Sequence, residues 1–232
     1  MERSYDYADI GDVSLRYLAE GSGNATVIFE SDLGGGIDDW ERVQPLISLF
    51  TRTLSYDRAD LQDNNPSLSP KSAENMVADL RKLLQVADIK PPYILVGHCA
   101  GAAHIRYFAH KYPNEVVGQV FVDGYDDAKA ADKTESHDIQ GATKRGQSIP
   151  FLNNAPTSIL VGDNPPETSA QTPEPTRRDR RQWIESHREW LRHMPQARFR
   201  VIANARRYLP LSHPDFVVEE INRVLADARR AL

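Results

Sequence analysis

The pentapeptide Gly97-His98-Cys99-Ala100-Gly101 is the stretch whose residue types and spacing most directly indicate chemistry. A nucleophile flanked by glycines two residues away on each side is typical of a sharp turn from a strand into a helix. Small residues are needed there because the two elements cross closely. An apolar run at residues 93–96 precedes the turn, and a helical pattern through His110 follows it. The spacing therefore predicts that Cys99 is a nucleophile presented on a strand-to-helix turn.

The position of Cys99 at a predicted helix start favours its thiolate form, because the backbone N–H groups and the helix dipole stabilise negative charge there. We therefore expect a lowered pKa for this thiol. The alternative is that Cys99 packs as a small hydrophobic residue in a turn without a catalytic role. As the only cysteine, it excludes an internal disulfide and a multi-cysteine zinc site, and we expect a cytoplasmic, reducing location.

The composition of the 232-residue chain fits one soluble α/β domain, with 40% hydrophobic and 26% charged residues. A net charge of −5 argues against nucleic-acid binding. No apolar run reaches the roughly 18 residues of a membrane-spanning helix, and the first residues lack the apolar core of a secretory signal. We expect a small-molecule substrate, no nucleic-acid or membrane partner, no cofactor and no metal; the oligomeric state stays open.

The elements that must position the turn alternate between short apolar runs and amphipathic segments. Strands are predicted at residues 13–17, 26–30, 53–56, 93–96, 116–122, 158–161 and 199–202. Helices are predicted at residues 40–50, 72–86, 182–193 and 216–225, besides the one through His110. This order predicts an α/β fold with a mostly parallel twisted sheet and helices on both faces. Residues 1–232 are expected to form a single domain, with a small cap at about 125–156 and a flexible loop at about 164–180.

Four segments in a row resemble serine esterases, lipases and lactonases of the α/β-hydrolase superfamily. FESDLGGGIDDW resembles the oxyanion loop, LSYDRAD the Asp-Arg turn, PPYILVGHCAGAAHIRYFAHKYP the nucleophile elbow with its helix, and VVGQVFVDG the following strand. The resemblance implies the α/β-hydrolase fold, with the active site at the carboxyl edge of the sheet. It implies that oxyanion- or substrate-binding groups come from Leu33, Ala100, His98, Asp123, Tyr208 and His213.

Three departures from the family pattern lie in the first half of the chain. Cys99 replaces serine, as it does in some relatives such as dienelactone hydrolases. Asp32 stands where relatives carry a small residue, and a fixed negative charge beside the oxyanion hole opposes a developing oxyanion. Asp60, followed by Gln62 and Asp63, stands where relatives tend to have glycine and serine.

A fourth departure concerns the catalytic base. Relatives place their catalytic histidine about seven residues before the proline that opens the last helix, and counting back from Pro214 gives Arg207. Arginine stays protonated near neutral pH, so it cannot act as a general base, although it can hold a thiolate or bind a carboxylate on the substrate. His213 is the nearest alternative base in the sequence.

The remaining histidines are expected to lie away from the thiol. His98 adjoins Cys99, but side chains of neighbours on such a turn are expected to point apart. His104 is expected to pack behind the elbow. Surface positions are expected for the others, which are His110, His137, His187 and His193.

Two carboxylates compete for the role of the catalytic acid. Asp163 follows the predicted strand 158–161, where the family usually places this residue, and Asp123 follows the preceding strand, which is an alternative site in some relatives. Either carboxylate can instead cap a turn.

Three functions are compatible with these residues. The first is an enzyme with a rebuilt triad that catalyses a non-hydrolytic cyclisation, isomerisation or lyase step of a biosynthetic kind, with Cys99, Arg207 and Asp32 in the pocket. The second is a cysteine-nucleophile esterase, lactonase or thioesterase. The third is a non-catalytic ligand-binding protein. The fold alone does not choose among them, and weak or absent ester hydrolysis is expected.

Overall fold

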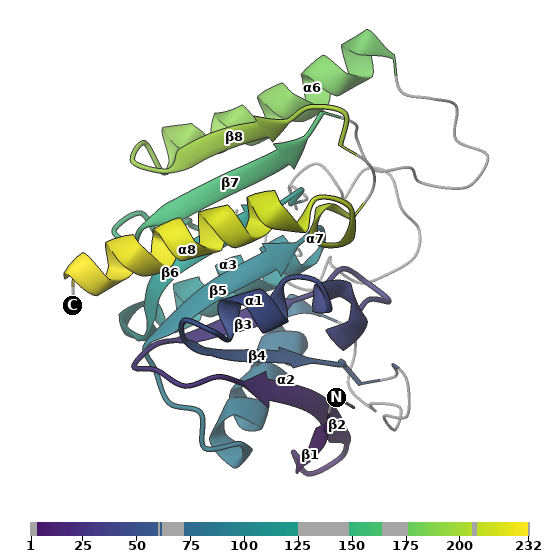
Figure 1. Ribbon diagram of the computed structural model, residues 1–232, viewed down its shortest axis with the longest axis vertical. Coiled ribbons are helices and arrows are strands. Elements are labelled where there is room, and N and C mark those ends of the chain that lie inside the picture. Colours follow the sequence, from purple (N-terminus) through teal and green to yellow (C-terminus); the bar gives the residue numbers. More distant parts are fainter. Residues whose placement is uncertain are drawn as a thin grey trace.

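The computed structural model describes residues 4–59, 61, 72–124, 149–163, 176–205 and 208–231. Its described strands form one eight-stranded sheet in the order β1-β2-β4-β3-β5-β6-β7-β8 (Figure 1). The strands are β1 (Asp6–Asp9), β2 (Ser14–Glu20), β3 (Thr26–Glu30), β4 (Arg52–Tyr56), β5 (Tyr93–His98), β6 (Val116–Val122), β7 (Thr157–Gly162) and β8 (Arg198–Ile202). β1 and β2 run antiparallel, as do β2 and β4, and all other pairs are parallel. The predicted mostly parallel sheet is confirmed, with β1 as an unpredicted edge strand.

Helices cover both faces of this sheet, as predicted. The longer ones are α2 (Ala73–Val86), α3 (Gly101–Lys111), α6 (Arg177–Arg188) and α8 (Pro214–Ala231). The short ones are α1 (Gln44–Ile47), α7 (Leu209–Ser212) and the 3-10 turns Ile37–Trp40, Pro113–Glu115 and Glu189–Arg192. In Figure 1, α1 and α8 lie in front of the sheet, whereas α2 and α3 lie behind it.

The two faces bury separate hydrophobic cores because side chains alternate along each strand. Ile28, Leu95 and Phe121 face α2 and α3, where they pack with Leu80 and Phe108. The intervening strand residues face α1 and α8 in a second core. This core includes Val27, Phe29, Ile94, Val96, Val120, Ile47, Val217 and Ile221. Burial on both faces fixes the register of the central strands, and so fixes where their carboxyl ends lie.

Two predicted elements differ from the observed ones for local reasons. The helix expected at residues 40–50 is a 3-10 turn followed by α1, because Pro45 stands at the start of α1 and cannot lie inside a continuous helix. α6 begins earlier than expected, because Thr176 and Asp179 form a capping box. Residues 176–180 of the predicted flexible loop are therefore the cap and first turn of α6. Residues 164–175 of that prediction lie outside the described residues, as does the 125–148 part of the predicted cap.

Candidate functional site

The turn around Cys99 has the geometry that its glycines predict. Cys99 has a left-handed backbone with φ +49°, between the end of β5 and the start of α3. A Cβ atom on Gly101 would lie 2.2 Å from the carbonyl oxygen of Glu30, and one on Gly97 would lie 2.6 Å from the carbonyl oxygen of Gly101. Only glycine fits at either position. A non-glycine residue in this backbone region is uncommon and points to a functional turn.

The carboxylate of Asp32 lies against two backbone donors beside this turn. Its Oδ1 accepts hydrogen bonds from the N–H of Leu33 at 2.8 Å and from the N–H of Ala100 at 3.2 Å. One donor follows β3 and the other directly follows Cys99. This is the arrangement by which an oxyanion hole binds a negatively charged oxygen. Here the oxygen that accepts from the two donors is Oδ1 of Asp32, and not an oxygen of a substrate.

Arg58 holds the backbone of the loop that carries Asp32. Its Nη1 donates to the carbonyl oxygen of Ser31 at 2.9 Å, and its Nη2 donates to the carbonyl oxygens of Asp32 and Gly35. The same guanidinium pairs with Glu30, at 2.7 Å between Nη1 and Oε1. The loop is therefore fixed by an ion pair that is almost completely buried.

Glu30 joins this loop to the helix behind Cys99. Besides Arg58, it accepts hydrogen bonds from the hydroxyl of Tyr56 at 2.5 Å and from Nδ1 of His104 on α3 at 2.9 Å. Burial acts to raise the pKa of Glu30, but the hydrogen bond from His104 and the charge of Arg58 outweigh it and hold the pKa below its usual value. The prediction that His104 packs behind the elbow is confirmed.

Asp39, in the 3-10 turn Ile37–Trp40 that follows this loop, adds a second carboxyl group beside it. Its carboxylate packs against Gly35, where an added Cβ would lie 2.0 Å from Oδ2. Burial and the nearby charge of Asp32 raise the pKa of Asp39 to about 6. The loop therefore loses one negative charge near Asp32 as the pH falls through 6.

His98 lies closer to Cys99 than the sequence predicted. Its Nε2 is 3.5 Å from the Sγ of Cys99, so the expectation that the two side chains point apart is wrong. The physical reason is the left-handed backbone of Cys99, which breaks the alternation that would hold along a continuing strand. The imidazole and the thiol are both buried.

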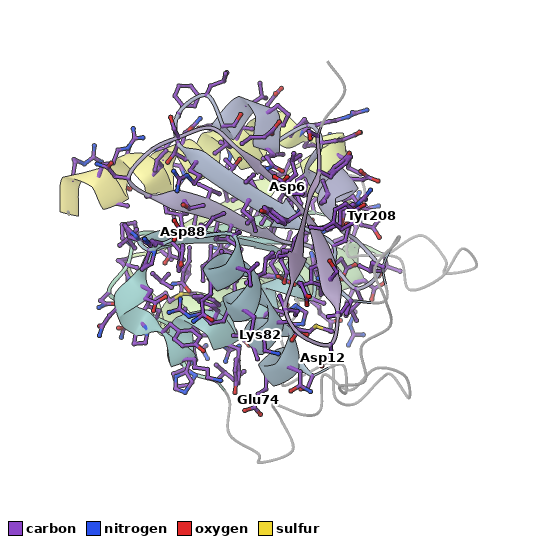
Figure 2. All side chains as sticks on the ribbon, turned by 90° about the horizontal axis from the view of Figure 1, so that it is seen from below. Asp6, Asp12, Glu74, Lys82, Asp88 and Tyr208 are labelled. Atoms are coloured by element: carbon purple, nitrogen blue, oxygen red, sulfur yellow. The ribbon has the colours of Figure 1, made fainter. Side chains whose placement is uncertain are left out.

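Tyr208 covers His98 from the segment that follows β8. The two rings lie 5.3 Å apart between centroids, and Tyr208 also has a left-handed backbone, with φ +63°. In Figure 2 it lies at the opposite end of the molecule from Asp88, which precedes β5 in the chain. Tyr208 is thus at the carboxyl edge of the sheet, as the resemblance implied.

The two candidate acids contact backbone N–H groups. Asp123, with φ +47°, accepts a hydrogen bond from the N–H of Gly162 at 2.6 Å. Burial raises the pKa of Asp123 to about 7, which this single hydrogen bond only partly opposes. Asp163 accepts hydrogen bonds from Asn204 and Ala205, each at 3.1 Å. Each carboxyl group thus supports a turn at the carboxyl edge, which was the alternative role for both.

The remaining histidines and candidate residues named from the sequence have varied positions. His213 contacts the hydroxyl of Ser212 at 2.9 Å and stacks on Phe216. His187 was expected at the surface, but it is buried, with Nε2 2.6 Å from the carbonyl oxygen of Gly124, so that prediction is wrong. His110 and His193 are exposed, as predicted. Arg207, Asp60, Gln62, Asp63 and His137 lie outside the described residues.

Sequence reasoning missed the buried ionic cluster of Glu30, Arg58 and His104. The available signals were a glutamate that ends an otherwise apolar strand and an arginine directly after another strand. Within the described ranges, the chain has no group of three or more His, Cys, Asp or Glu side chains that could hold a metal ion. None of the described helices combines the length and apolar character needed to cross a membrane.

Comparison with known proteins gives one family match and several partial relatives. The family described as alpha/beta hydrolase fold matches residues 26–178, more than half of the chain. An uncharacterised Bacillus subtilis protein, YqjL, is 32% identical over 104 residues, which is 45% of this chain and 41% of that protein. An AB hydrolase superfamily protein of Gibberella zeae is 33% identical over 88 residues, which is 36% of this chain and 27% of that protein. The matches thus span less than half the length of these relatives.

Solved structures resemble the whole chain. A proposed lipase from Acinetobacter baumannii AYE matches with a TM-score of 0.79 at 17% identity, covering 99% of this chain and 93% of that one. An esterase from Thermogutta terrifontis matches with a TM-score of 0.69 at 17% identity, covering 98% and 99%. At this identity the likeness concerns the fold alone.

Proposed function

The chain belongs to the α/β-hydrolase fold family, and from this premise we propose that it is a small-molecule enzyme whose reaction is non-hydrolytic, of cyclisation, isomerisation or lyase type. It acts as a single domain that includes the small cap predicted from the sequence at about 125–156. Asp32 carries the proposal, because its carboxylate accepts the two hydrogen bonds that acyl transfer would offer to a developing oxyanion. Losing a single such donor costs about 10²–10³ in kcat in a hydrolase.

Asp32 is well placed to move a proton instead. The N–H groups of Leu33 and Ala100 fix its Oδ1, and Oδ2 makes no hydrogen bond to any part of the chain that the structure describes. A held carboxylate with one open oxygen is suited to general acid–base chemistry on a substrate above the elbow. In this proposal Cys99 is the reactive thiol, Arg207 binds an anionic group of the substrate, and Asp163 and Asp123 support the turns around the pocket.

A second function is favoured by one specific contact. The 3.5 Å approach of His98 to the Cys99 thiol would suit a cysteine-nucleophile hydrolase, provided that Asp32 leaves the two backbone donors during turnover. The two functions differ in what the unmodified protein does to an activated ester.

An ester-hydrolysis assay separates these functions. It compares turnover of p-nitrophenyl acetate by the unmodified protein, Asp32→Gly and Asp32→Gly/Cys99→Ala. We expect very weak turnover by the unmodified protein. Turnover should rise at least about tenfold in Asp32→Gly, because the donors become free, and should disappear in the double variant. Asp38→Gly, which removes an exposed carboxylate from the same loop, is the matched control and should change nothing. Ordinary esterase turnover by the unmodified protein, lost in Cys99→Ala, would overturn the proposal in favour of the cysteine hydrolase.

A further inference from the structure

The Cys99 thiol and the imidazole of His98 form a contact between consecutive residues. The 3.5 Å distance from Sγ to Nε2 is within hydrogen-bond range for sulfur, and residues Cys99 and His98 are only 5% and 1% exposed. Buried from water, a thiol and an imidazole at this distance can share a proton in either direction.

The other described histidines that are not exposed contact groups other than Cys99. His104 donates to Glu30, His187 lies between the carbonyl oxygens of Gly124 and Trp183, and His213 contacts Ser212. Among the histidines that the structure describes, His98 is therefore the one whose ring nitrogen contacts the sulfur of Cys99.

The surroundings of the pair bear on its charge state. Tyr208 packs on the imidazole from the segment after β8. The neighbouring strand ends carry Asp32 after β3 and Asp123 after β6, and Asp123 is largely protonated below neutral pH because burial raises its pKa to about 7. An imidazolium paired with a thiolate adds no net charge to this buried region, so forming it costs less than ionising either group alone.

We propose that His98 is the catalytic base for Cys99, so that the nucleophile and its base are adjacent residues of one turn. The proton moves from Sγ to Nε2, and the sulfur electron pair forms an S–C bond to the carbon of a substrate carbonyl. The π pair of that carbonyl moves to its oxygen, which takes the proton back from Nε2. This inference rests on the proposed use of Cys99 as the reactive group. Relatives take their catalytic base from a histidine before the last helix, where this chain carries Arg207. In the proposed arrangement the base instead comes from the elbow, as His98.

Alkylation by iodoacetamide tests the pair without knowledge of the substrate, because the thiolate forms the S–C bond, iodide leaves, and the proton stays on the imidazole. The rate is measured against pH for the unmodified protein, His98→Gln and the control His110→Gln, which changes an exposed histidine on α3. We expect His98→Gln to slow labelling at pH 7 about tenfold and to move the midpoint of the profile up toward about 8.5, the value of a free thiol. His110→Gln should match the unmodified protein. An unchanged profile in His98→Gln would overturn the proposal.

A second measurement keeps the proposal testable if His98→Gln does not fold. The NMR titration of the His98 ring in the unmodified protein is compared with that in Cys99→Ala. If the pair exists, removing the thiol must shift the titration of the ring, and an unshifted titration contradicts the proposal. Neither experiment depends on Asp32, so ester turnover by Asp32→Gly and alkylation can fail separately, and each failure identifies which proposal is wrong.

Discussion

Glu30 and Asp123 are both buried carboxyl groups at the carboxyl edge of the same sheet, but their surroundings shift their pKa values in opposite directions. Glu30 receives hydrogen bonds from Arg58, His104 and Tyr56, and its pKa is lowered. Asp123 receives one backbone hydrogen bond, from Gly162, and its pKa is raised to about 7. Charged partners, rather than depth of burial, therefore decide which of the two carboxyl groups is ionised.

The contrast divides the candidate site into two regions. The region at the ends of β3 and β5 is fixed by buried ionic contacts, and it retains the backbone geometry of a hydrolase while Asp32 occupies its two donors. In the region at the ends of β6 and β7, Asp123 has no cationic partner among the described residues. The carboxyl groups of Asp123 and Asp163 bind the backbone of neighbouring turns. The two regions thus differ in the partners of their buried carboxyl groups, which are buried cations for Glu30 in the first region and a backbone N–H group for Asp123 in the second.

The largest expected effect is on the free energy of unfolding, when the buried ion pair of Glu30 and Arg58 is broken. Glu30→Gln removes the negative charge opposite the buried Arg58, and leaving such a charge without its partner costs about 3–5 kcal/mol. Urea unfolding of this variant and of Glu115→Gln gives the comparison, since Glu115 pairs with Arg81 where both side chains are partly exposed. We expect a loss of less than about 1 kcal/mol in Glu115→Gln. Similar losses of unfolding free energy in both variants would show that burial does not make the ion pair of Glu30 and Arg58 more important for stability than the exposed pair.

A pH-dependent effect is expected in the other region. Because folding raises the pKa of Asp123, the folded protein binds this proton more tightly than the unfolded chain. The free energy of unfolding therefore falls as the pH rises from about 4 to about 7, by roughly 4 kcal/mol for three units at about 1.4 kcal/mol each. Asp123→Asn keeps an acceptor for Gly162 and removes the titration, so it should match the unmodified protein at pH 4.5 and exceed it in stability at pH 8.

Urea unfolding at several pH values checks this expectation. Asp79→Asn, at a half-buried position on α2, serves as the control and should leave most of the pH dependence in place. Parallel stability curves for Asp123→Asn and the unmodified protein would mean that Asp123 does not hold a proton in the folded state.

A smaller effect is expected at Asp163. Its carboxylate accepts hydrogen bonds from Asn204 and Ala205 and is partly exposed, so its role resembles that of a helix-capping side chain. Asp163→Ala should cost about 1 kcal/mol in thermal unfolding, and Asp163→Asn, which keeps one acceptor, should cost less. Equal losses in both variants would indicate that charge, rather than the acceptors, holds this turn.

The sequence predicted the central sheet and the elbow because both have strong local signals. The apolar strands at residues 26–30 and 93–96 and the paired glycines each restrict the backbone by themselves. The resemblance to α/β-hydrolases also implied that Asp32 lies beside the oxyanion donors. Its hydrogen bonds to both donors could not be predicted, because they depend on a rotamer and on two distant segments meeting.

The contacts that the sequence missed are those between distant segments. Glu30, Arg58 and His104 lie on three different elements, and no spacing rule joins residues 28 and 74 positions apart. The contact of His98 with Cys99 was misjudged for the opposite reason. The expectation that neighbouring side chains on the turn point apart does not hold here, because Cys99 has a left-handed backbone.

The central claim is that, in the resting protein, the carboxylate of Asp32 accepts hydrogen bonds from both oxyanion donors, the N–H groups of Leu33 and Ala100. The most direct measurement is the amide proton chemical shift of Ala100 and Leu33, compared between the unmodified protein and Asp32→Ala, with the Gly162 amide as the internal reference because it bonds to Asp123. Charge-assisted hydrogen bonds are strong, so both donor protons should lie downfield and move upfield together in the variant while Gly162 stays in place. Unchanged positions for Ala100 and Leu33 in Asp32→Ala would contradict the account.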